Sequence, residues 1–166
     1  MSGIVIYRSS TGSTKQYAGW IHEETGFPVY ESGDRAIPWA DADTVVIGCP
    51  IVALKPALTG WIAKNWDRMQ GRRVVLFTTS GADPADKPVK DWIDKALPES
   101  IRSEIRAFPL PGRFDYAQLK GVGKVMIWFA ANVLRNADVQ NQVKNPVDGV
   151  ARANLSELLA HLKGLG

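Results

Sequence analysis

The segment from Ile4 to Trp20 constrains the fold of this chain more than any other stretch. An apolar, largely β-branched run, Ile4 to Tyr7, is followed by six small residues, 9–14, which are all Ser, Thr or Gly. A helical pattern begins directly after them and places Tyr17 and Ile21 on one face. The sequence therefore predicts a buried strand, a tight loop and the N-terminus of a helix.

This loop has the composition of an anion-binding site. Gly12 lets the backbone approach a ligand closely, and the first N–H groups of the following helix are unpaired and lie at the positive end of the helix dipole. Hydroxyl groups that a phosphate could accept from are those of Ser9, Ser10, Thr11, Ser13 and Thr14. The alternative is a Ser/Thr-rich helix cap that binds nothing.

Two other phosphate-binding motifs are absent from the sequence. A Walker loop places Gly-Lys directly before Ser or Thr, whereas the order here is Gly12-Ser13-Thr14-Lys15. The chain also contains no G-x-G-x-x-G dinucleotide motif, because the pair Gly121 and Gly123 lacks a third glycine and a preceding strand.

Further strands and helices alternate along the chain. Strands are predicted at 28–31, 44–48, 73–78 and 104–110. Helices are predicted from Pro56 through Trp66, around 89–97 and at the C-terminus around 150–162. Such alternation implies right-handed crossovers and a doubly wound α/β fold, with a five-stranded parallel sheet covered on both faces in a single domain, 1–166.

Three loops of this fold are expected to meet at the carboxyl edge of the sheet. They are 9–14, 49–54 and 79–84, which follow the first, third and fourth strands and are rich in small residues. In addition to the first loop, we expect ligand contacts from Pro50, Ile51, Val52, Ala53, Leu54, Thr79, Ser80, Gly81 and Asp83.

Composition excludes several classes of protein. The single cysteine, Cys49, precludes an internal disulfide, and two distant histidines without partner cysteines predict no metal site. The net charge of +3 comes without a Lys/Arg run, so we expect no nucleic-acid binding. The N-terminus lacks the pattern of a signal peptide, and the apolar run 125–134 is about half a bilayer span, so a cytoplasmic protein is expected.

The spacing Ser9-x-Thr11-Gly12-x-Thr14 resembles the phosphate loop of the flavodoxins. Those proteins hold the phosphate of FMN with hydroxyl and backbone N–H groups and need no basic side chain. The resemblance covers nearly the whole chain, and it implies FMN as the cofactor and a flavodoxin-like strand order of 2-1-3-4-5.

Two further segments resemble a subgroup, the flavodoxin-like protoporphyrinogen dehydrogenases. They are Val46-Ile47-Gly48 leading to a helix with Trp61-Ile62-Ala63-Lys64-Asn65, and Lys124-Val125-Met126-Ile127-Trp128-Phe129 after an Arg/aromatic stretch. The resemblance implies oxidation of protoporphyrinogen IX and transfer of the electrons to a quinone. Loop 49–54 lacks the aromatic and basic residues expected of that subgroup, and 136–148 does not match its ending.

The segment 111–146 is an insertion after the fifth strand, with a predicted helix at about 119–134. Its residues 122–134 are apolar on more than one face, which favours a membrane, greasy-substrate or dimer surface. Positive residues near it are Arg106, Arg113, Lys120, Lys124 and Arg135, and they could meet a carboxylated substrate or an anionic membrane. A solvated helix face is the simpler explanation of these charges.

Two functions remain open from the sequence. One is an FMN-dependent oxidoreductase with an exposed flavin face; the other is an electron-carrier flavodoxin that serves a redox partner. Loops 49–54 and 79–84 contain no Trp or Tyr, so Phe114 or Tyr116 could supply a ring beside the flavin. The basic composition differs from the acidic one that carriers use for docking. No residue stands out as a catalytic acid or base.

Overall fold

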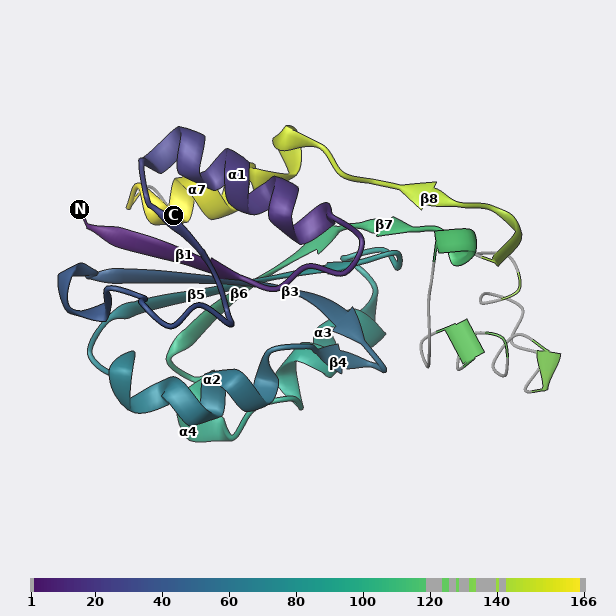
Figure 1. The fold of residues 1–166 in the computed structure, drawn as a ribbon. Helices are drawn as coiled ribbons and strands as arrows, with labels where there is room; N and C mark the ends of the chain where they lie inside the picture. Colours follow the sequence, from purple (N-terminus) through teal and green to yellow (C-terminus); the bar gives the residue numbers. More distant parts are fainter. Residues whose placement is uncertain are drawn as a thin grey trace.

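The structure is a computed structural model that describes residues 2–118, 124, 125, 128, 132, 133, 140 and 143–164. Its centre is a sheet of five parallel strands in the order β2-β1-β3-β5-β6, and a short strand, β4, pairs antiparallel with β3 (Figure 1). The strands are β1 (Gly3–Tyr7), β2 (Val29–Glu31), β3 (Thr44–Val52), β4 (Lys55–Pro56), β5 (Arg73–Ser80) and β6 (Ile105–Pro111). The predicted order 2-1-3-4-5 is confirmed.

Helices cover both faces of this sheet. Figure 1 shows α1 (Ser13–Thr25) and α7 (Ser156–Leu162) above it, and α2 (Thr59–Asn65), α3 (Lys87–Asp94) and α4 (Glu99–Arg102) below it. Short 3₁₀ turns are η1 (Trp39–Asp41), η2 (Trp66–Arg68), η3 (Tyr116–Gln118) and η4 (Arg152–Leu155). Helix α1 ends at Gly26, whose φ of 74° is the left-handed conformation expected of a terminating glycine. None of the described helices is long and apolar enough to cross a membrane.

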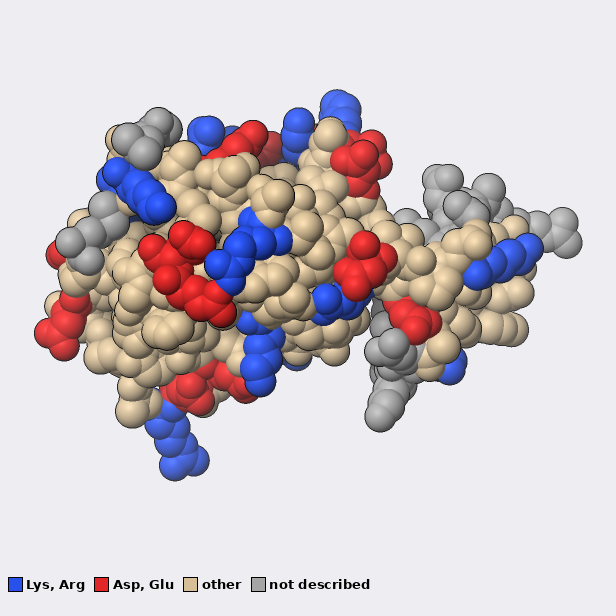
Figure 2. Space-filling model, turned by 90° about the horizontal axis from the view of Figure 1, so that it is seen from above, with Lys and Arg blue, Asp and Glu red and all other residues tan. Residues whose placement is uncertain are grey.

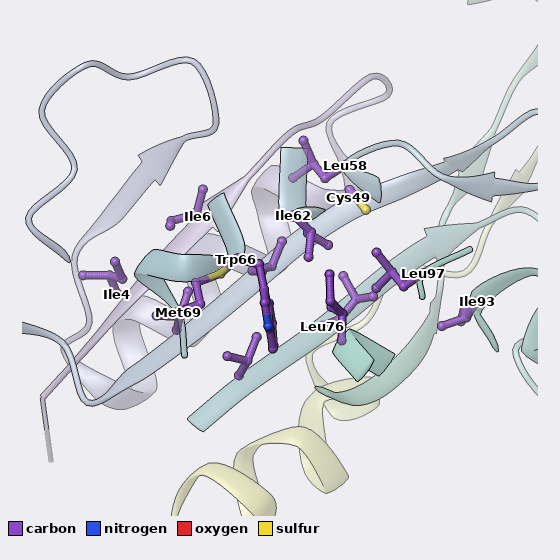
Figure 3. Packing of buried hydrophobic residues seen from close by; sticks show 14 of the residues in the cluster. Ile4, Ile6, Cys49, Leu58, Ile62, Trp66, Met69, Leu76, Ile93 and Leu97 are labelled. Atoms are coloured by element: carbon purple, nitrogen blue, oxygen red, sulfur yellow. The ribbon is translucent and has the colours of Figure 1, made fainter. Parts of the chain in front are cut away.

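The alternation of side chains along each strand produces two hydrophobic cores. In β1, Ile4 and Ile6 belong to the lower core, whereas Val5 and Tyr7 belong to the upper one. Figure 3 shows the lower core between the strands and α2, where Ile62 and neighbouring apolar side chains pack on the sheet. Burying one such side chain stabilises the fold by about 1.5–3 kcal/mol, so both layers of helices are held by the sheet.

Close packing at the centre of the sheet requires a glycine in β3. A Cβ placed on Gly48 would lie 2.1 Å from the ring of Phe77, which is fully buried in the upper core. The neighbouring strand β5 pairs with β3 over seven residues, from Thr44 with Arg73 to Pro50 with Thr79. This register brings the carboxyl ends of β3 and β5 to the same level.

The edge strand β6 contains Pro109 and Pro111, which pair with Thr78 and Ser80 of β5. Proline has no N–H group, so these two positions offer no donor to a further strand. The opposite edge strand, β2, is only three residues long. Both features limit pairing with another sheet at the edges.

A two-stranded ribbon continues from the carboxyl edge of the sheet. Strand β7 (Arg113–Phe114) pairs antiparallel with β8 (Val147–Asp148), and Figure 1 shows the ribbon leading away from the body of the domain. The predicted insertion, 111–146, therefore begins at the last residue of β6 and includes β7, and residues 115–146 lie between the two strands of the ribbon. Of the helix predicted at 119–134, Lys124, Val125, Trp128 and Asn132 are helical, and most of the other positions lie outside the described residues.

The structure corrects the prediction for residues 49–56. Strand β3 continues through Val52 instead of ending at Gly48, so Pro50, Ile51 and Val52 are strand residues and not loop residues. Pro56 lies in β4, and α2 begins three residues later, at Thr59. The physical reason is that the chain reverses direction after Val52 and β4 pairs with the end of β3, so that Ile51 lies opposite Pro56 in a hairpin. Pro50 and Pro56 are unusual in strands, so the sequence did not indicate this hairpin.

Candidate functional site

Loop 8–12 leads from β1 into α1 and has the geometry of an anion site. The Ser9 hydroxyl accepts a hydrogen bond of 3.1 Å from the Gly12 N–H, which closes the turn. Gly12 has φ 84°, a left-handed conformation that favours glycine, and it is the N-cap residue of α1. No side chain within the described part of the chain caps this helix end. Its first N–H groups are therefore available to an anion.

The helix begins earlier than predicted, at Ser13, so Ser13 and Thr14 are the first residues of α1 and not loop residues. The hydroxyl groups of residues 9–14 divide into two sets. Ser10 and Thr11 are exposed, whereas Ser13 and Thr14 are both 1% exposed. The Ser13 hydroxyl accepts the Arg113 N–H at 2.9 Å and lies 3.0 Å from the Thr11 hydroxyl. A hydroxyl has one donor and two acceptor positions, so if Thr11 donates in their hydrogen bond, the Ser13 proton can be given to a ligand.

Thr14 connects α1 to the end of β5. Its Oγ1 lies 2.9 Å from Oγ1 of Thr79, which is 4% exposed. If Thr79 donates in this hydrogen bond, the Thr14 proton can be given to a ligand at the helix N-terminus. The predicted loop residues 9–14 and Thr79 are thus brought together, although they are 65 or more residues apart in sequence.

The β3–β4 hairpin forms a second wall at this edge. Its two-residue turn, Ala53 and Leu54, has φ values of 49° and 64°. A pair of positive φ values is the signature of a type I′ turn, which normally contains Asn or Gly. The apolar side chains of Val52 and Leu54 are 48% and 63% exposed, so the tip of the hairpin presents apolar surface to solvent.

The third predicted loop begins later than expected, because β5 continues through Ser80. The Ser80 hydroxyl donates to the Ala82 carbonyl at 3.1 Å, and Asp83 accepts the Ala85 N–H at 2.8 Å. Gly81 lies against Phe114: a Cβ on this glycine would be 2.7 Å from the Phe114 Cβ. Both polar side chains shape the loop, and Gly81 allows the approach of an aromatic residue from the ribbon.

The comparisons with known proteins agree with this architecture. The family model described as a flavodoxin domain matches residues 4–140. The chain belongs to the flavodoxin family. No curated protein matches its sequence at a significant level.

Solved structures of similar proteins are distant in sequence from this flavodoxin-family chain. A flavoprotein from Lactobacillus acidophilus in complex with FMN is 18% identical, with 66% of this chain and 91% of that chain covered and a TM-score of 0.45. A protein from Bacteroides eggerthii is 14% identical, with coverages of 80% and 98% and a TM-score of 0.49. A flavodoxin from the domain Archaea is 17% identical, with coverages of 63% and 90% and a TM-score of 0.40.

Arg113 fastens the ribbon to the first helix of the flavodoxin fold. Its Nε donates to Asp148 at 2.8 Å, and its Nη2 donates to Gln16 Oε1 at 2.7 Å. The hydrogen bond from Arg113 holds the pKa of Asp148 below its usual value. From the sequence, Arg113 could be placed only near the insertion and its partners Gln16 and Asp148 could not be found, because no local pattern predicts the pairing of β7 with β8.

The two aromatic residues proposed from the sequence lie in different surroundings. Phe114 contacts Gly81 at the carboxyl edge of the sheet, the edge at which ligands bind in sheets of this kind. Tyr116 lies farther along the ribbon, and the Lys124 Nζ is 5.3 Å from the centre of its ring. Phe114 is therefore the better placed of the two for a cofactor contact.

Two buried ionisable side chains of the strands, Cys49 and Tyr7, are poorly suited to catalysis. Burial raises the pKa of the Cys49 thiol to about 11, so it stays neutral and unreactive near pH 7. Burial and a hydrogen bond to Glu31 raise the pKa of Tyr7 to about 12. Among the described residues, no group of three His, Cys, Asp or Glu side chains could hold a metal ion.

Figure 2 shows interspersed positive and negative charges on the face formed by α1 and α7.

Proposed function

We propose that this chain binds FMN and acts as a flavodoxin-like oxidoreductase. The observation that carries the proposal is loop 9–14, with Gly12 in the left-handed conformation, exposed hydroxyls on Ser10 and Thr11, and an α1 N-terminus that no described side chain caps. This cradle fits a phosphate and lies beside the carboxyl ends of β3 and β5.

Bound FMN would supply the capacity to accept and donate one or two electrons. The chain's own residues would bind and orient it: the loop by hydrogen bonds to the phosphate, and Phe114 with the hairpin tip by apolar contact with the ring. Leu54 and Phe114 come from opposite sides of this edge, the hairpin and the ribbon. The protein would therefore contribute by positioning the cofactor, and not by acid or base chemistry.

We further propose a substrate of the protoporphyrinogen IX class and a quinone as electron acceptor. Three apolar residues of the insertion, Val125, Trp128 and Val133, are 64%, 52% and 52% exposed. They are preceded by a ribbon that begins with Arg113 and Phe114 beside the candidate flavin site. Exposed apolar surface is suited to a large aromatic substrate or a membrane surface that holds a quinone.

The test is oxidation of protoporphyrinogen IX by the FMN-loaded protein with a quinone acceptor. The variant Val125→Ser/Trp128→Ser/Val133→Ser should retain FMN and lose most of the turnover, because it removes the apolar surface and not the cradle. The matched control is Val147→Ser, which changes an apolar residue that is 38% exposed on β8 and should leave turnover unchanged.

Other results would change the assignment. A loaded protein that exchanges electrons with a redox protein but does not oxidise protoporphyrinogen would be an electron carrier. The same triple variant, examined by sedimentation and by flotation with anionic vesicles, distinguishes a homodimer surface from a peripheral membrane contact.

A further inference from the structure

A groove separate from the phosphate cradle lies between the β3–β4 hairpin and α3. It encloses about 470 Å³, within the range of small-molecule sites. One wall is formed by Leu54 and Lys55 of the hairpin, and the other by α3 with its C-cap residue Lys95. Leu54, at the tip of the hairpin, borders both this groove and the edge where the flavin is proposed.

Positive charge dominates the groove. Three lysines line it, Lys55, Lys87 and Lys95, against a single carboxylate, Asp91. The Asp91 carboxylate is 2.8 Å from the Lys87 ammonium and 3.9 Å from that of Lys95. The side chains of Lys87 and Lys95 are 85% and 80% exposed. Because both lysines share the single Asp91 carboxylate, each ammonium group can also bind another anion.

Lys55 adds a charge from the opposite wall. It is exposed, and no carboxylate among the described residues forms an ion pair with it. A hydrogen bond from Lys87 lowers the pKa of Asp91, which therefore stays ionised at neutral pH. The groove thus carries an excess of two positive charges.

Apolar surface lies between these charges. Trp92 is half-buried, packs against the lower core and lines the groove. Leu54 faces solvent with 63% of its surface exposed, and Ala96 also lines the groove. An indole ring and aliphatic side chains favour a flat apolar body, since aromatic rings contribute contact area without losing many rotamers.

We propose that this groove binds an organic dianion with a flat aromatic or apolar body. Its anionic groups would lie on the ammonium groups of Lys55, Lys87 and Lys95, and its body on Trp92 and Leu54. The ammonium groups of Lys87 and Lys95 both approach the same oxygen of Asp91 on α3, whereas Lys55 lies on the hairpin wall, so two anionic groups on one molecule can engage lysines of opposite walls. The proposal does not depend on FMN.

The probe is naphthalene-2,6-dicarboxylate, titrated calorimetrically into the full chain without FMN at low ionic strength. We expect saturable binding at one site that weakens at 0.5 M salt by the screening of exposed charges. Lys87→Gln and Lys95→Gln should each weaken binding about 2- to 5-fold, and Asp91→Asn should strengthen it by a similar factor.

The matched control is Lys90→Gln. Lys90 is exposed on the same helix but does not line the groove, so its loss should leave binding unchanged. All four substitutions are at surface positions and remove no core contact, and unchanged far-UV circular dichroism would verify the fold. As a neutral comparison, 2-naphthalenemethanol should bind more weakly than the dicarboxylate.

Three results would overturn the proposal. They are no saturation by the dicarboxylate, an equal loss of binding in Lys90→Gln, and binding of polyglutamate without binding of the dicarboxylate, which would indicate an acidic protein partner. Because FMN is absent from these titrations, their failure would leave the proposed FMN site unaffected.

Discussion

At the level of single residues, the hydroxyl groups of residues 9–14 have two different roles, one in ligand binding and one in holding α1 to the strands. Ser10 and Thr11 face solvent, whereas Ser13 and Thr14 also join α1 to β7 and β5. The sequence motif alone does not distinguish these two sets of hydroxyl groups. Their burial shows that substitutions in the loop should separate loss of ligand binding from loss of stability.

Thr11→Ala should weaken FMN binding by about 1–2 kcal/mol, because a hydrogen bond to a charged group contributes this much. Its effect on stability should be small, because Thr11 is exposed and the Ser13 hydroxyl that it contacts keeps the hydrogen bond from the Arg113 N–H. Thr14→Ala should weaken FMN binding similarly and also lower the free energy of unfolding by about 1 kcal/mol, because the buried Thr79 hydroxyl loses its partner. Calorimetric titration and urea denaturation measure the two effects. Equal stability of the two variants would contradict the assignment of these roles.

The motif Ser9 to Thr14 could be located from sequence because its residues are contiguous and small. The contacts of Arg113 could not, since Gln16 and Asp148 are 97 and 35 residues away. The sequence around Gln16 or Asp148 does not indicate that either residue binds Arg113. Only the pairing of β7 with β8 and the closeness of α1 bring these side chains together.

At the scale of elements, the buried strands were predictable and the hairpin was not. The segments 44–48 and 73–78 contain the apolar runs Val45-Val46-Ile47 and Val74-Val75-Leu76-Phe77, which are typical of central parallel strands, and they lie in β3 and β5 respectively. The extension of β3 to Val52 follows from its pairing with β4, across a turn without the Asn-Gly signal of hairpins. Local composition therefore indicated a loop.

The β3–β4 turn yields a prediction about stability. The double substitution Ala53→Asn/Leu54→Gly should raise the free energy of unfolding by about 1 kcal/mol, because it places the preferred residues at two positions with positive φ. Little packing is lost, since Leu54 is 63% exposed. Urea denaturation measures the change, and a variant less stable than the wild type would show that the turn is not type I′.

The ribbon yields a prediction about pH. The pKa of Asp148 is lowered in the folded protein by its hydrogen bond from Arg113, so the stabilisation is present above the unfolded pKa of about 4 and is lost as the pH falls through the lower folded pKa. The pair is partly exposed, which limits its contribution to a few tenths of a kcal/mol.

Hydrogen exchange of the β7 and β8 amides, corrected for intrinsic rates, checks this expectation. Protection should fall in acid in the wild type, and it should be low and independent of pH in this range in Asp148→Asn. Protection in the variant that equals the wild type at neutral pH would mean that the ion pair does not hold the ribbon.

At the scale of the whole molecule, the strand order places three loops at one edge. The order β2-β1-β3-β5-β6 reverses its direction of growth between β1 and β3, and ligands of such sheets bind at that point. The alternation of strands and helices made this arrangement predictable from the sequence. The direction of the β7–β8 ribbon was not, because it depends on two-residue strands separated by 32 intervening residues.

A calorimetric titration of the cofactor-free chain with FMN and, separately, with riboflavin shows whether the N-terminus of α1 binds the phosphate of FMN. Riboflavin carries the same ring but lacks the phosphate, so the comparison isolates the cradle formed by loop 9–14 and α1. We predict micromolar or tighter binding of FMN and binding of riboflavin at least about tenfold weaker, since several charge-assisted hydrogen bonds are missing. Equal affinity for the two compounds, or no binding of FMN, would contradict the account.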